Sequence, residues 1–124
     1  MTAATAKPSV ILVHGTFADA SSWASVIERL QVAGIKVMAV SNHLRGLKHD
    51  GDYVASVADQ ITGPVVLVGH SYSGPVITHA GSKANNVKGL VYISSFGLDK
   101  GTGAVSQPEA VANFILESVT STGI

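Results

Sequence analysis

Four short runs of apolar residues recur along the chain, and each is followed, directly or after a loop, by apolar residues at helical spacing. The runs lie at residues 9–13, 35–40, 65–69 and 87–96. Strands that are almost wholly apolar and alternate with helices are typical of a parallel sheet covered on both faces. The sequence therefore predicts one α/β domain over residues 1–124, with a parallel sheet of about four strands.

The spacing of apolar residues also predicts where the helices lie. Helices are expected over 23–33, 53–61, 76–81 and 106–118, the first ended by Gly34 and the last opened by a capping-box sequence at Ser106. The polar segment 41–52 is expected to be a loop.

Composition excludes several classes of protein. The chain has 8 basic and 8 acidic side chains, so no net charge favours nucleic acid or an anionic membrane. The absence of cysteine removes disulfides, thiolate metal sites and cysteine nucleophiles. The start "MTAATAKPSV" lacks a signal-peptide pattern and no apolar run is long enough to span a bilayer, so we expect a soluble cytoplasmic protein.

The stretch "VVLVGHSYSGPVI", residues 65–77, places Ser71 between small neighbours where a strand gives way to a helix. A strand that ends in Gly-x-Ser-x-small and continues as a helix holds the middle residue in a strained, exposed conformation, which suits a nucleophile. The other interpretation is a polar residue in an ordinary Gly-rich turn. The pentapeptide alone leaves both open.

Three motifs together resemble the α/β-hydrolase superfamily. They are "VILVHGTFADASSW", "VVLVGHSYSG" and "LVYISSFGLDKG", and the resemblance is closest to small esterases related to plant methylesterases and hydroxynitrile lyases. It runs from about Ser9 to Leu116 and implies the N-terminal half of that fold, with 106–118 as the start of the cap region. It implies Ser71 as the nucleophile, a small ester as substrate and no cofactor or metal.

Attack by Ser71 on a carbonyl carbon requires hydrogen-bond donors about 3 Å from the oxygen that becomes negative. The backbone N–H of Tyr72 is one expected donor. Gly15 allows a sharp turn after the first strand, so the N–H of Thr16 is the expected second donor, with Phe17 instead if the loop is shifted by one residue. Supporting roles are expected for four neighbours, namely His14, Gly15, Gly69 and His70.

The base that would activate Ser71 is not evident. A serine triad needs a histidine oriented by a carboxylate, and the resemblance implies that both follow the fourth strand. All five histidines lie at or before His79, so weak or absent activity is expected of the isolated chain. His14 as a substitute base and Asp99 as the acid are the alternatives.

Two further groups of polar residues have competing interpretations. Ser73 stands where the resembling family most often has glycine, and its hydroxyl is expected to cap the following helix. A possible metal cluster is formed by His43, His49, Asp50 and Asp52. A solvated loop is the preferred interpretation, because the spacing and ligand types do not fit a metal site.

Two rivals to a hydrolase follow from other classes. One is a catalytically silent binding domain with a pocket under the 106–118 helix. The other, a dinucleotide-binding module, is set aside because the first strand ends in "VHGTFADA" and not in G-x-G-x-x-G.

The expected edge strand over Leu90 to Ile93 has no charge or proline to prevent pairing, so we expect a homo-oligomer formed through it.

Overall fold

The computed structural model describes residues 8–15, 23–41, 43, 45–70, 72–93 and 108–121. Strands and helices alternate along them as the sequence predicts. Their order is β1 (Ser9–Val13), α1 (Ala24–Val32), β2 (Val37–Val40), α2 (Leu47–Asp59), β3 (Val65–His70), α3 (Ser73–Lys83), β4 (Val87–Ile93) and α4 (Pro108–Ser121).

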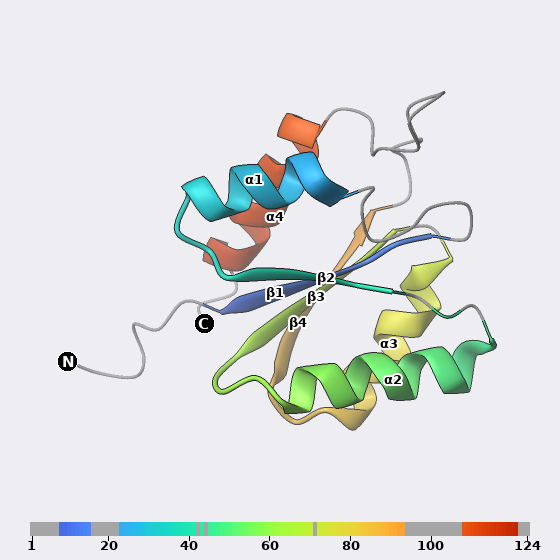
Figure 1. Cartoon of the computed structure of the whole chain (residues 1–124). Coiled ribbons are helices and arrows are strands. Elements are labelled where there is room, and N and C mark those ends of the chain that lie inside the picture. The colour runs from blue at the N-terminus through green and yellow to red at the C-terminus, as the bar shows by residue number, and fades with distance from the viewer. Residues whose placement is uncertain are drawn as a thin grey trace.

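The four strands form one parallel sheet in the order β2-β1-β3-β4. Helices α1 and α4 cover one face of this sheet, and α2 and α3 cover the other (Figure 1). The predicted class, a parallel sheet with helices on both faces, is therefore confirmed. The order leaves β2 and β4 as the edges, and the ends of β1 and β3 adjacent in the middle.

Alternate residues of β1 show how each face is filled, because successive side chains of a strand point to opposite sides. Val10 and Leu12 join the apolar cluster under α1 and α4, whereas Ile11 and Val13 join the cluster under α2 and α3. All four are buried, as are all six residues of β3. The two apolar layers hold the central strands rigidly, which matters because these strands carry the candidate site.

Helix α2 begins at Leu47, well before the first apolar residue of the expected helix, so the prediction of a loop over 41–52 is wrong for its second half. The inward-facing residues of the extra turns are Asp50 and Gly51, both buried and neither apolar. The Asp50 carboxylate accepts the Arg45 backbone N–H at 3.1 Å, which satisfies an unpaired donor before the helix. A hydrogen-bonded acid thus takes the place of an apolar residue.

Smaller differences concern the ends of elements. Strand β2 begins at Val37, two residues later than expected, and α3 continues past Gly81 to Lys83. Gly34, predicted to end the first helix, has φ +83° directly after the C-cap of α1. Among the described residues, no helix combines the length and the apolar character needed to cross a membrane.

Candidate active site

The carboxyl ends of β1 and β3, which are neighbours in the middle of the sheet, bring two of the predicted site segments together. Val13 pairs with Gly69 in the parallel register, so the chain leaves both strands at neighbouring points. His14 and Gly15 follow the first strand, and Tyr72 lies just past the end of the third. The nucleophile, the loop donors and the alternative acid lie outside the described residues; these are Ser71, Thr16, Phe17 and Asp99.

The turn after β1 is fixed by two hydrogen bonds to successive carbonyls. His14 is only 4% exposed, and its Nδ1–H donates to the Gly15 carbonyl at 2.8 Å. The His14 carbonyl accepts a hydrogen bond from the hydroxyl of Ser73, a residue 59 positions later at the start of α3. The prediction that Ser73 caps its own helix is wrong: α3 has no side-chain cap bond, and this hydroxyl points across to β1.

Gly69 is needed for the close approach of α3 to the sheet. A Cβ at this position would lie 2.7 Å from the Ser73 carbonyl oxygen and 2.9 Å from its carbon. Both are backbone atoms, which cannot move without shifting the helix. The absence of a side chain at Gly69 therefore allows the first turn of α3 to lie against β3.

Tyr72, whose N–H is an expected oxyanion donor, is held in place by a hydrogen bond of its side chain. It has helical φ and ψ of −49° and −30° directly before α3. Its phenol O–H donates to Asp50 Oδ2 at 3.2 Å, and Asp50 is only 1% exposed. Burial first, and then the hydrogen bond to Asp50, raises the pKa of Tyr72. This link from α2 to the turn was missed in the sequence, where Asp50 is one of several acids in a polar stretch.

His70, at the end of β3, is 6% exposed and lies edge-on to the indole of Trp23, with ring centroids 6.2 Å apart and planes at 79°. Trp23 is fully buried, and within the described ranges its Nε1 has no hydrogen-bond partner. The His70 ring thus packs toward the α1 side of the sheet.

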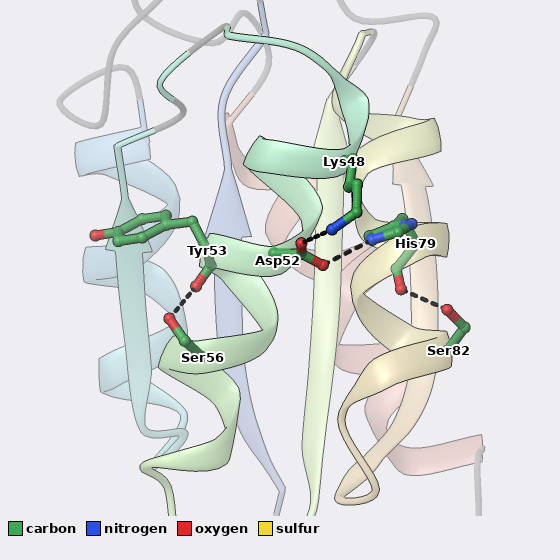
Figure 2. Close-up of polar contacts among 6 residues, drawn as sticks. All are labelled: Lys48, Asp52, Tyr53, Ser56, His79 and Ser82. Atoms are coloured by element: carbon green, nitrogen blue, oxygen red, sulfur yellow. Dashed lines mark hydrogen bonds and ion pairs between the residues drawn. The ribbon is translucent and has the colours of Figure 1, made fainter.

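A second polar group lies between α2 and α3 and was not foreseen. Asp52 accepts hydrogen bonds from Lys48 Nζ at 2.8 Å and from His79 Nε2 at 2.9 Å, and the second of these joins α2 to α3 (Figure 2). These bonds, that from Lys48 first, lower the pKa of Asp52 to about 2. The pairing residues are 27 positions apart, and no local pattern indicates it.

The four residues considered as a metal cluster do not share one partner. His43 Nδ1 and His49 Nε2 are 3.1 Å apart, and Asp50 and Asp52 bond to different groups. Three of these residues belong to α2, so the solvated loop is wrong for them. Across the described parts of the chain, no group of three metal-ligating side chains is arranged to hold an ion.

An open groove of about 610 Å³ lies along α3 beside β4. Its lining comprises Leu47, Gly74, Pro75, Thr78, His79, Ser82 and Tyr92. It lies on the α2–α3 side of the sheet, opposite the pocket expected under α4. The described inner face of α4, including Val111 and Ile115, is packed into the core beneath α1.

The model of the alpha/beta hydrolase family matches residues 10–121, and the chain belongs to this family. The chain is 28% identical to a carbendazim-hydrolyzing esterase of Nocardioides sp. (strain SG-4G), over 85% of this chain and 51% of that protein. It thus spans about half the length of the curated relative that it matches.

Solved structures of similar fold include a pyrethroid hydrolase from Sphingobium faniae JZ-2, with a TM-score of 0.58 and 26% identity over 68% of this chain and 38% of that one. Polyneuridine aldehyde esterase gives a TM-score of 0.63 at 22% identity, over 89% of this chain and 48% of that chain. These likenesses confirm the expected resemblance and the partial α/β-hydrolase fold.

Proposed function

We propose that this chain is the nucleophile-bearing part of a serine hydrolase that acts on small carboxylic esters. The observation that carries the proposal is the pairing of Val13 with Gly69, which brings the turn after β1 and the turn before α3 to one edge of the sheet. Membership of the family and the esterase relatives support the reaction class.

In the proposed reaction, the Ser71 hydroxyl oxygen attacks the ester carbonyl carbon and loses its proton to a base or to water. The backbone N–H groups of Tyr72 and Thr16, or of Phe17 in place of Thr16, stabilise the negative oxygen. The tetrahedral intermediate expels the alcohol, which takes up a proton, and water then releases the acid from the acyl-enzyme. No cofactor is required.

We assign His14 a supporting role in this reaction. Its Nδ1–H is engaged by the Gly15 carbonyl, so the ring braces the turn on which the second donor depends. Without a triad base the chain is expected to be slow, because the oxyanion hole and substrate binding alone accelerate the reaction only about 10³- to 10⁴-fold over its rate in water.

Hydrolysis of a nitrophenyl acetate ester tests the proposal. Ser71→Ala is expected to abolish the protein-dependent rate, while Thr16→Ala, which keeps its backbone N–H, is the matched control and changes it far less. Full activity of Ser71→Ala would show that the hydrolysis is nonspecific and would contradict the proposal.

The second candidate function is a catalytically silent binding domain, and the groove along α3 favours it. Leu47, Pro75 and the Tyr92 ring give this groove an apolar lining. A folded chain that binds small apolar molecules there but shows no reaction at Ser71 would support this second function over the first.

A further inference from the structure

We propose that Ser73 is a positioning residue of the proposed hydrolase, which fastens the His14–Gly15 turn to the segment that follows the nucleophile. This inference rests on the proposed function. Ser73 directly follows Tyr72, so the residue that binds the β1 turn is covalently joined to one expected oxyanion donor. One side chain thus links the two parts of the chain that must supply donors to the same oxygen.

The bond is a long-range tether inside the protein. The Ser73 hydroxyl donates to the His14 carbonyl, Ser73 is fully buried and His14 is 4% exposed. A buried hydrogen bond that connects distant segments is protected from competition by water, and its removal costs more than that of an exposed one.

The position of the hydroxyl is set by the packing of α3. Because Gly69 has no side chain, the Ser73 backbone lies against β3, and the hydroxyl of this first helical residue reaches past β3 to the end of β1. The order β1-β3 in the sheet makes these segments neighbours. The tether is therefore a product of three features: the sheet order, the glycine and the hydroxyl.

A second bond acts on the same turn. The Gly15 carbonyl accepts the His14 Nδ1–H at 2.8 Å, so two successive carbonyls of the turn are held. Each carbonyl belongs to a planar peptide unit that also contains the N–H of the following residue. Fixing both carbonyls fixes the orientation of both peptide units, which is the property an oxyanion hole needs from its backbone.

Loss of the tether should impair transition-state stabilisation more than substrate binding. Displacement of a catalytic group by 1 Å can cost on the order of 10²-fold in rate. For Ser73→Ala we expect kcat to fall about tenfold or more, with KM within about twofold. Ser73→Cys, which keeps a weak S–H donor, should recover part of the loss.

The experiment combines these kinetics, on nitrophenyl acetate, with amide hydrogen exchange of the peptide that contains His14 and Gly15. Ser73→Ala should exchange about tenfold faster there than the unmodified chain. The matched control is Ser56→Ala, which removes an exposed hydroxyl of α2 that donates to the Tyr53 carbonyl at 2.6 Å. This control should change neither readout.

Unchanged exchange in Ser73→Ala would overturn the tether. Faster exchange with an unchanged Ser71-dependent kcat would overturn the positioning role. If hydrolysis by the unmodified chain does not depend on Ser71, the proposed function has failed, and the exchange readout alone then decides whether the tether exists. If Ser73→Ala does not fold, Ser73→Gly, which also lacks the hydroxyl, carries the same measurements.

Discussion

Asp52 accepts hydrogen bonds from Lys48 and from His79, and the hydrogen bond from Lys48 is the larger cause of its lowered pKa. The pKa falls from 3.8 to about 2, so between these values the unfolded chain binds more protons than the folded one. The stability that this carboxylate contributes is therefore present above about pH 4 and lost as the pH falls toward 2.

We predict that Asp52→Asn reduces the loss of folding stability between pH 5 and pH 3. Urea unfolding midpoints of the variant and the unmodified chain, measured at pH 5 and pH 3, should differ more at pH 5. In a Lys48→Met background, Asp52→Asn should change the unfolding midpoint at pH 5 by less, because Lys48 is the main hydrogen-bond donor to Asp52. Equal losses of stability in the unmodified chain and in Asp52→Asn on acidification would contradict the assignment.

A hydrogen bond between the Tyr72 phenol and the Asp50 carboxylate links the residue before α3 to α2. Tyr72→Phe removes the phenol donor and leaves an oxygen of a buried carboxylate without it, so we predict a loss of about 1–3 kcal/mol in the free energy of unfolding. A double-mutant cycle with Asp50→Asn measures the coupling, which should be well above 0.5 kcal/mol. Additive effects of the two substitutions would show that the bond contributes little.

At the scale of elements, α2 and α3 pack closely because Gly51 faces His79. A Cβ at Gly51 would lie 2.9 Å from His79 Cβ and closer still to the ring. Gly51→Ala should gain about 0.5–1 kcal/mol from helix propensity, but displacement of the His79 side chain should cost about 1–3 kcal/mol. The overpacking term is the larger, so the variant is expected to be destabilised.

The matched control for this prediction is Gly81→Ala in α3. Its Cβ would lie 3.2 Å from Leu90 Cδ2, the far end of a flexible side chain, and at an ordinary contact distance of 3.6 Å from Val87 Cγ1, so the variant should be neutral or slightly stabilised. Urea unfolding compares the two variants. A Gly51→Ala chain as stable as Gly81→Ala would contradict the close packing of the two helices.

The strands could be predicted because each is a mostly apolar run, and β1 has the expected bounds of Ser9 and Val13. The start of α2 could not, since its buried early residues, Asp50 and Gly51, carry no apolar signal. The expectation that the turns after the first and third strands supply donors to one oxygen agrees with the pairing of Val13 with Gly69. The bonds that brace the candidate site join residues 22 and 59 positions apart, at Asp50–Tyr72 and His14–Ser73, and no local pattern specifies such pairs.

At the scale of the whole molecule, β4 is an edge strand of the sheet. Its side chains alternate, with Val91 and Ile93 buried and Tyr92 50% exposed. Residues 90–93 of this strand contain no proline and no charged side chain. Such an edge is a template for another strand, and two copies paired through β4 would form a sheet of about eight strands. We therefore propose a dimer formed through this edge.

Sedimentation equilibrium at micromolar concentration is expected to show this dimer. Tyr92→Lys should weaken it by placing a charge beside the edge, whereas Phe114→Lys, at a similarly exposed position on α4, is the control and should not. Val91 is unsuitable for this test because its side chain belongs to the core. A stable monomer of the unmodified chain would refute the pairing.

Reaction with a fluorophosphonate probe tests the proposal that Ser71 is a nucleophile beside a backbone oxyanion hole. The reaction is read by intact mass and then by peptide mapping. We predict that one adduct per chain forms slowly, that it is located at Ser71 and that it is absent from Ser71→Ala. A folded chain that stays unlabelled, or one labelled to the same extent after Ser71→Ala, would contradict it.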